Sequence, residues 1–246
     1  MSAAAPDRVH ANRNIVLWAL ALTALAALGA GAVHKQVRDG NDFPLYWQAA
    51  RDLVADRSPY DVTSGLHGYV YLPWFALLLG PLAVLPLPVA AACWYAANLA
   101  FLWLAGRALL DALDVAAPRP PALALILATL PLAGLFHDNL VLGQANLLLL
   151  LLLAAGVRGA LAPRARWAQG IPLGLAASLK MPAALLLLPL ALRGRARATA
   201  GFAVGVALAL ALPFLTTGVP FGRQLLGEWR TKVVALGHAS NAVGTI

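Results

Sequence analysis

The feature that most constrains this chain is a series of long apolar runs that carry very few charged residues. An α-helix rises about 1.5 Å per residue, so roughly 20 apolar residues are enough to cross a bilayer. Only 11% of the 246 residues are charged, whereas a water-soluble domain carries about a quarter charged residues. We therefore expect an all-α, polytopic transmembrane helical bundle that forms a single domain over residues 1–246. Its six to seven apolar segments are Ile15–Val33, Tyr71–Leu87, Val89–Leu110, Ala122–Phe136, Leu140–Val157, Ile171–Leu192 and Thr199–Leu215.

The net charge of +8 favours the lipid bilayer over nucleic acid as a partner, because the basic residues lie in short loops between apolar runs. Such loops set membrane topology and contact anionic lipid headgroups. The single cysteine, Cys93, lies inside an apolar run, which excludes an intrachain disulfide and a cysteine metal cluster. The sequence has no glycine-rich phosphate loop, and we expect no cofactor.

The basic residues also predict the orientation of the chain. Arg8, His10 and Arg13 precede the first run and place the N-terminus in the cytoplasm. Ala30-Gly31-Ala32 resembles a signal-peptidase site, but a run of 19 residues is long for a signal core, and further runs follow. We expect a retained first span in a bacterial plasma membrane, followed by a first extracytoplasmic loop over residues 34–68.

The later loops leave one point of topology open. The basic loops at 158–166 and 193–197 are expected in the cytoplasm. Because residues 34–68 are expected outside and Arg158 inside, the chain between them must cross the membrane an odd number of times. Four apolar runs lie in this interval, which gives an even number. Either Tyr71–Leu87 or Ala122–Phe136 is re-entrant, or the Arg158 loop lies outside.

The run Ile171–Leu192 is expected to leave the cytoplasm and return to it. Lys180 and Pro182 lie near its middle, and proline cannot continue a helix without losing a backbone hydrogen bond. Two half-length helices that meet at Lys180 satisfy both observations, and a break of this kind is tolerated where it lines a cavity or is buried in protein. Lys180 beside a new helix start is an arrangement that binds phosphate.

Within the first outside loop, residues 44–56 have the periodicity of an amphipathic helix that lies on the membrane surface. Its apolar face contains Leu45, Ala49 and Leu53 with Tyr46, Ala50 and Val54; its polar face contains Gln48, Arg51, Asp52 and Asp56.

Asp42 stands directly before this expected helix. One interpretation is a helix N-cap, and the other is a general base that the helix start keeps ionised. Asp39 together with Asp42 is a weak candidate for a metal site.

A polar stretch, His137-Asp138-Asn139 followed by Gly143-Gln144 and Asn146, lies between two apolar runs. Ionisable residues at membrane depth are usually functional, which favours a functional role for His137 and Asp138. For Gln144 and Asn146, hydrogen bonding between helices is an equal alternative. Beyond Leu215 the chain becomes polar, and residues 216–246 are expected to begin a later outside loop of a longer protein.

These motifs, in this order, resemble those of glycosyltransferase family 87, which comprises GT-C-type α-mannosyltransferases that use polyprenyl-phosphate-mannose. The resemblance rests on four segments: Asp42-Phe43 with Tyr46-Trp47; Ser58-Pro59-Tyr60-Asp61 with Tyr69-Val70-Tyr71-Leu72-Pro73; His137-Asp138-Asn139 with Gly143-Gln144 and Asn146; and Leu173-Gly174-Leu175 with Lys180 and Pro182. It implies that Asp42 is the catalytic base and that the donor phosphate contacts Lys180 and the polar stretch. Tyr60 and Tyr71 are the aromatic residues expected to bind substrate.

The resulting hypothesis is a membrane glycosyltransferase that moves a hexose, mannose by resemblance, from a polyprenyl-phosphate donor to a glycolipid or glycan acceptor on the extracytoplasmic face. Two alternatives stay open. Broken helices and buried charges also build the sites of multi-span transporters. The second alternative is a membrane subunit that binds the lipid carrier and catalyses no reaction.

Overall fold

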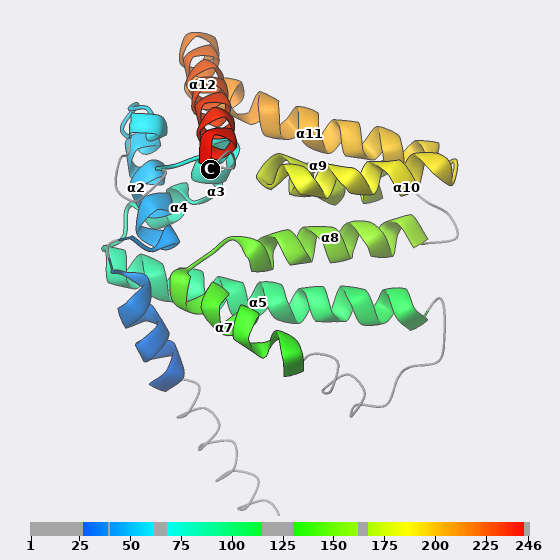
Figure 1. The fold of residues 1–246 in the computed structure, drawn as a ribbon, viewed down its shortest axis with the longest axis horizontal. Helices are drawn as coiled ribbons and strands as arrows, with labels where there is room; N and C mark the ends of the chain where they lie inside the picture. Colours follow the sequence, from blue (N-terminus) through cyan, green and yellow to red (C-terminus); the bar gives the residue numbers. More distant parts are fainter. Residues whose placement is uncertain (1–26, 39, 62–67, 115–129, 162–166, 244–246) are drawn as a thin grey trace, which may run out of the picture.

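The computed structural model describes residues 27–38, 40–61, 68–114, 130–161 and 167–243. Within these ranges the regular elements are helices, and no strand is present. Helices that lie side by side form the main bundle (Figure 1). They are α5 (Leu87–Asp114), α8 (Asn146–Leu161), α9 (Ile171–Leu179), α10 (Leu187–Leu192) and α11 (Ala196–Thr217).

The remaining helices lie at the sides and at one end of this bundle. They are a helix at 27–36, α2 (Asp42–Val54), α3 (Pro73–Leu78), α4 (Gly80–Ala83), α7 (Ala133–Leu142) and α12 (Val219–Val243). The end of the bundle where α5 and α8 begin and α11 finishes carries α2, α3 and α12, and we call it the site end. The opposite end carries Arg158, Arg193, Arg195 and Arg197, and we call it the basic end.

Among the residues that the structure describes, two helices are long and apolar enough to cross a membrane, namely Leu87–Ala112 and Ala196–Thr217. They confirm the expected runs Val89–Leu110 and Thr199–Leu215 as span-length helices. Large apolar side chains also face outward, for example Trp103 at 61% and Leu192 at 78% exposure. Long apolar helices with an exposed apolar surface indicate a membrane protein.

The other expected runs are not continuous span-length helices in the part of the chain that the structure describes. Tyr71–Leu87 is broken into α3 and α4, of six and four residues, because Pro73 and Pro81 begin new helical turns. The run Leu140–Val157 is interrupted at Gly143, and α8 begins only at Asn146. Most of Ile15–Val33 and Ala122–Phe136 lies outside the described residues. The expected count of six to seven spans therefore stays a prediction.

The run Ile171–Leu192 forms the predicted hairpin. Helix α9 ends at Leu179, Lys180 is extended (φ −140°, ψ 116°), and a 3₁₀ helix, η4 (Met181–Leu186), leads into α10. Leu173 near the start of α9 packs in one apolar cluster with Leu190 near the end of α10, so the two arms lie side by side. Lys180 is therefore at the tip of the hairpin, at the site end of the bundle (Figure 1).

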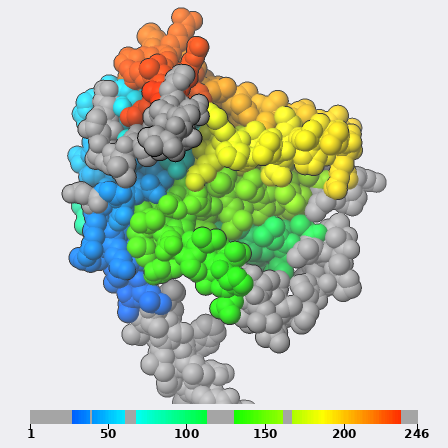
Figure 2. Space-filling model, viewed as in Figure 1, coloured from blue at the N-terminus to red at the C-terminus, as the bar shows by residue number. Residues whose placement is uncertain are grey.

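The hairpin is fixed to α11 by glycines that allow two backbones to touch. A Cβ atom on Gly174 would lie 2.2 Å from the carbonyl oxygen of Phe202, and one on Gly205 would lie 2.3 Å from that of Ile171. Small residues four apart on each helix, with Gly170 before Gly174 and Gly201 before Gly205, are typical of helix packing in membranes. On its other side the hairpin lies against α8, as the yellow and green surfaces of Figure 2 show.

Helix α2 begins and ends two residues earlier than the expected range 44–56, and it buries four residues of the predicted apolar face, namely Tyr46, Ala49, Ala50 and Leu53. Phe43 is buried as well, whereas Val54, placed on the apolar face, is 59% exposed. Asp52, placed on the polar face, is buried and accepts hydrogen bonds from Gln48 and Arg57. The reason is that α3, α4 and α5 cover α2, which therefore belongs to the largest apolar core of the protein.

Candidate active site

Asp42 is the first residue of α2, so the N-cap interpretation was wrong in detail. Asn41 occupies the N-cap position, and neither side chain caps the helix. A carboxylate in the first turn still lies at the positive end of the helix dipole, which favours its ionised form. The side chain of Asp42 is half-buried at the site end.

The turn between α7 and α8 reaches the start of α2 through Gly143. This residue has a φ of +70°, in the left-handed region where glycine is favoured. A Cβ atom there would lie 2.5 Å from Cβ of Phe43 and 2.7 Å from Nε2 of Gln36. Trp94 holds the same turn from α5 by donating its indole N–H to the Gly143 carbonyl at 2.9 Å. Only glycine allows this turn to pack directly beside Asp42.

Lys180 at the tip of the hairpin meets the first residue of α8. Its Nζ donates to Oδ1 of Asn146 at 2.6 Å, and Nδ2 of Asn146 donates to Oε1 of Gln144 at 2.6 Å. Lys180 is half-buried. A charged hydrogen bond of this kind is stronger than a neutral one, so it fixes the hairpin tip to the turn that carries Gln144.

Asp42 completes this arrangement by a hydrogen bond with Gln144. Burial raises the pKa of Asp42 above its ordinary value of 3.8, while the Gln144 hydrogen bond and the charge of Lys180 oppose that rise. The charge effect places the lysine near the carboxylate. We call Asp42, Gln144, Asn146 and Lys180 the Asp42 cluster. It brings together residues from three sequence motifs that are far apart in the chain.

Two tyrosines extend the Asp42 cluster toward the aromatic core. The hydroxyl groups of Tyr46 and Tyr71 are 3.0 Å apart and share a hydrogen bond. Burial raises the pKa of both tyrosines, and the negative charge of Asp42 adds to the rise, so both lie near Asp42. Tyr60 lies one step further away, and its hydroxyl donates to the Tyr71 carbonyl at 2.9 Å.

Asn139 has a structural role in the described part of the chain. It is 3% exposed, its amide donates to Oδ1 of Asn98 at 3.3 Å, and its side-chain oxygen accepts from the backbone N–H of Asn146 at 3.2 Å. These bonds connect α5, α7 and the start of α8. Asn139 thus makes hydrogen bonds between helices, the role that was the alternative for Gln144 and Asn146 of the same polar stretch.

His137 and Asp138 are not brought into the Asp42 cluster. Both are exposed on α7, because successive helical residues point about 100° apart and Asn139 takes the inward direction. Asp39, the weak partner of Asp42 for a metal, lies outside the described residues. Among the described residues, no group of three or more possible metal ligands occurs.

Sequence reasoning missed a second polar group, which α12 carries where the start of a polar loop was expected. Glu228 accepts hydrogen bonds from the Ser58 hydroxyl and, at 2.9 Å, from the Gln224 amide. Lys232 donates to the Tyr60 carbonyl at 2.7 Å. Gln224, Glu228 and Lys232 recur every four residues, and this spacing on one helix face was the available signal.

This second group lines a cavity of about 580 Å³ beside α12. The lining residues are Tyr60, Gln224, Gly227, Glu228, Thr231, Lys232 and Ala235. Tyr60 connects this cavity to the tyrosines beside the Asp42 cluster. Its backbone carbonyl accepts from Lys232 in the cavity wall, and its hydroxyl contacts Tyr71.

A family model described as glycosyltransferase family 87 matches residues 69–243. The match covers Tyr71, Gln144, Asn146, Lys180 and the described part of α12 up to its end, and it begins after Asp42. No curated protein and no solved structure matches the chain.

Proposed function

The chain belongs to glycosyltransferase family 87, and from this premise we propose that it transfers a hexose, mannose by family resemblance, from a polyprenyl-phosphate donor to a glycolipid or glycan acceptor. A glycosyltransferase needs a sugar donor, an acceptor and a group that activates the attacking hydroxyl. The observation that carries the proposal is the Asp42 cluster, in which hydrogen bonds through the side-chain amides of Gln144 and Asn146 link a carboxylate to a lysine.

Asp42 is the proposed general base. Its ionised carboxylate takes the proton from an acceptor hydroxyl while that oxygen forms a bond to the anomeric carbon of the donor sugar. The bond between the anomeric carbon and the phosphate oxygen breaks, and its electron pair leaves with the polyprenyl phosphate. A single displacement of this kind inverts the configuration at the anomeric carbon.

Lys180 is the proposed partner of the departing phosphate. Negative charge grows on the bridging oxygen as the bond breaks, and a fixed cation at that position stabilises the transition state more than the bound donor. The hydrogen bond to Asn146 holds Nζ in place before the donor arrives. Gln144 links the proposed base to the proposed phosphate site, because it contacts both Asp42 and Asn146.

The position of the Asp42 cluster in the bundle supports an extracytoplasmic site. The cluster is at the site end, and Arg158, Arg193, Arg195 and Arg197 are at the basic end (Figure 1). Basic loops favour the cytoplasmic side, so the site end faces outward and the N-terminus lies in the cytoplasm. The broken segment Tyr71–Leu87 is then the one that does not cross, which gives the odd number of crossings that the charges require.

The cavity beside α12 is the proposed approach for the acceptor. It offers a carboxylate, an amide and a hydroxyl, which are groups that bind sugar hydroxyls. From there the Tyr60–Tyr71–Tyr46 contacts lead to Asp42.

The test is transfer by the protein reconstituted in lipid vesicles, with labelled polyprenyl-phosphate-mannose, polyprenyl-phosphate-glucose and GDP-mannose as separate donors and a lipid extract as acceptor. We expect a labelled glycan product and release of polyprenyl phosphate from a polyprenyl-linked donor only. Transfer from the nucleotide sugar would overturn the donor assignment. Carrier-dependent sugar uptake into vesicles without any product would favour a transporter instead.

A further inference from the structure

Tyr46 and Tyr71 share a hydrogen bond between groups of different burial. Tyr46 lies on α2 one helical turn after Asp42 and is 1% exposed, whereas Tyr71 is half-buried. The two hydroxyl oxygens are 3.0 Å apart. Among the residues that the structure describes, the Tyr71 oxygen is the acceptor that the proton of the Tyr46 hydroxyl can reach.

The direction of this hydrogen bond follows from the burial of Tyr46. A tyrosine hydroxyl carries one proton and also accepts a hydrogen bond. If Tyr71 were the donor, the Tyr46 proton would be buried without an acceptor, which is costly because the proton has also lost its hydrogen bond to water. With Tyr46 as the donor, both groups are satisfied, and the Tyr71 proton is left to bind another oxygen.

The Tyr71 ring is held by its aromatic neighbours, so its hydroxyl group has a fixed position. The ring centroids of Tyr46, Phe75 and Tyr69 lie 5.3, 5.1 and 5.9 Å from that of Tyr71. Tyr60 holds the backbone of the same residue by donating to its carbonyl at 2.9 Å. The hydrogen bond from Tyr46 then restricts rotation of the Tyr71 O–H bond.

The proton that Tyr71 can donate lies near Asp42. Burial raises the pKa of Tyr71, and the negative charge of Asp42 adds to the rise. Asp42 and Tyr46 are also four residues apart on α2, which places them on the same helix face. Asp42 itself has a hydrogen bond with Gln144, so an oxygen that binds Tyr71 would lie beside the carboxylate without replacing that bond.

Tyr71 is connected to the acceptor side of the proposed reaction rather than to the donor side. Lys180, the proposed partner of the donor phosphate, is linked to Asp42 through two side-chain amides. Tyr71 is linked instead through Tyr60 to the cavity beside α12, which is the proposed approach for the acceptor.

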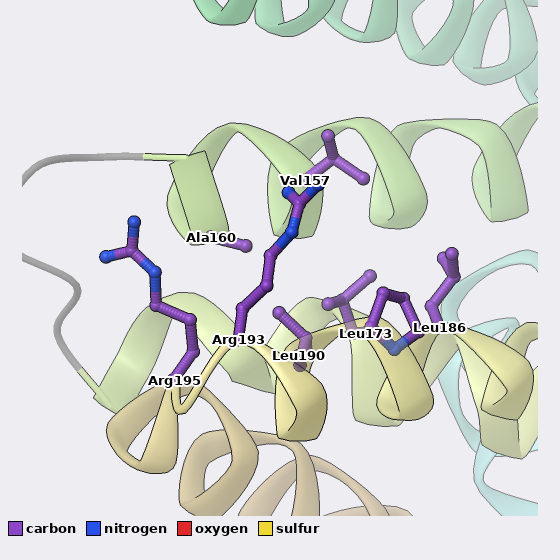
Figure 3. A pocket seen from close by; sticks show the side chains of 8 residues that line it. Val157, Ala160, Leu173, Leu186, Leu190, Arg193 and Arg195 are labelled. Carbon is purple, nitrogen blue, oxygen red and sulfur yellow. The ribbon is translucent and has the colours of Figure 1, made fainter.

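The cavity at the basic end of the bundle is separate from this site. It has a volume of about 130 Å³, and Figure 3 shows the aliphatic side chains of Leu173 and Leu190 beside Arg193 in its wall. The residues that line it include no member of the Asp42 cluster. The cavity beside α12 is therefore the one that leads to Tyr71.

We propose that Tyr46 is a positioning residue, which directs the Tyr71 hydroxyl to donate a hydrogen bond to an oxygen of the bound acceptor. This inference rests on the proposed function and deepens it. The oxygen belongs to a second hydroxyl beside the attacking one, because a phosphate or carboxylate there would be repelled by Asp42. The acceptor is thus a sugar or polyol with neighbouring hydroxyls. Asp42 takes the proton of the attacking hydroxyl, and Tyr71 keeps its own proton throughout.

The test is a set of tyrosine-to-phenylalanine variants of the full chain. Transfer from labelled polyprenyl-phosphate-mannose is measured in vesicles at increasing amounts of a lipid-extract acceptor, and thermal unfolding is measured in detergent. Tyr46→Phe should raise the acceptor KM about tenfold, the value of one ordinary hydrogen bond, and leave the donor KM unchanged. Tyr71→Phe should raise the acceptor KM at least as much. It should also lower the unfolding temperature, because the Tyr46 proton loses its acceptor.

The double variant Tyr46→Phe/Tyr71→Phe separates positioning from stability. It should regain the unfolding temperature, since no buried proton is left unpaired, but it should not regain the acceptor KM. Tyr95→Phe on α5, whose ring lies against Gly29, is the control and should change neither quantity.

Two outcomes would overturn the proposal: an unchanged acceptor KM in Tyr46→Phe, or an acceptor KM that returns together with stability in the double variant. Absence of transfer by the unaltered chain would overturn the proposed function instead. The unfolding temperatures of the Tyr71→Phe and double variants would still test the direction of the hydrogen bond, because they do not depend on transfer.

Discussion

At the scale of single residues, Asp42 combines a half-buried carboxylate with a pKa that burial raises above 3.8. A base works only when it is deprotonated, so transfer should increase with pH as Asp42 ionises, with a midpoint above the ordinary value. The measurement is kcat/KM for transfer from pH 4 upward. A rate that stays constant down to pH 4 would contradict the assignment of Asp42 as the base.

The same carboxylate predicts an effect on stability. An acid whose pKa is raised by folding binds more protons in the native state than in the unfolded state, so its contribution to stability falls as pH rises through that interval. Above the raised pKa, Asp42→Asn removes a buried charge and keeps an oxygen for Gln144. Its unfolding temperature at neutral pH should equal or exceed that of the unaltered protein, measured by thermal unfolding in detergent. A marked decrease would indicate a structural role.

Lys180 permits a second test at this scale. Lys180→Gln keeps a group that can donate to Asn146 but removes the charge, and kcat should fall about 100-fold if the charge stabilises the departing phosphate. Lys180→Arg restores the charge and should recover part of the rate. Equal rates for the glutamine and arginine variants would show that charge at this position has no role in transfer.

Residue patterns predicted the members of the Asp42 cluster better than their neighbours. Gln144, Asn146 and Lys180 were candidates from the sequence because each is polar within an apolar context, and Asp42 was a candidate because it directly precedes an expected helix. His137 and Asp138 satisfied the same criterion but are exposed. Which residue of a helix points inward depends on contacts such as Asn139 with Asn98, and those contacts are made by chain segments 41 residues apart.

At the scale of elements, the glycines that let backbones touch determine where the site residues lie. Gly143→Ala forces a Cβ into the start of α2 and strains a residue with positive φ, at a cost of about 1–3 kcal/mol. Transfer should decrease along with stability, because the turn carries Gln144. Gly134→Ala on α7, where a Cβ meets no atom within 4 Å, is the control and should leave both unchanged.

The α9–α11 contact predicts a similar result for the hairpin. Gly174→Leu places a side chain against the backbone of α11, and overpacking of this kind costs about 1–3 kcal/mol. Gly106→Leu on α5, where a Cβ has open space, is the matched control. Unfolding temperatures in detergent should decrease for the first variant only. Equal temperatures for the two variants would mean that α9 and α11 do not pack through these glycines.

The sequence predicted some elements well and others poorly, for physical reasons. The break at Lys180 was predictable because Pro182 cannot donate a backbone hydrogen bond. The burial of Asp52 on the predicted polar face of α2 was not, since α3, α4 and α5 cover sides of the helix that a surface helix would leave open. Helix α12 was missed because its polar residues resemble a loop. Their four-residue spacing gains meaning only with the contacts that α12 makes with Ser58 and Val70, far away in the chain.

At the scale of the whole molecule, the separation of the Asp42 cluster from the arginines predicts the orientation in the membrane. In a Cys93→Ser background, a cysteine replacing exposed Arg230 on α12 should react with a membrane-impermeant maleimide in intact cells. A cysteine replacing exposed Arg197 should react only after permeabilisation. The reverse pattern would place the site end in the cytoplasm.

The central claim is that Asp42 performs base catalysis in sugar transfer, and one comparison tests it most directly. The measurement is transfer from labelled polyprenyl-phosphate-mannose by Asp42→Asn and Asp56→Asn, each in the full-length chain reconstituted in vesicles. Asp56 is exposed at the end of the same helix with a φ of +54°, which asparagine tolerates. Asp42→Asn should abolish transfer and Asp56→Asn should retain it. Full transfer by Asp42→Asn would contradict the account.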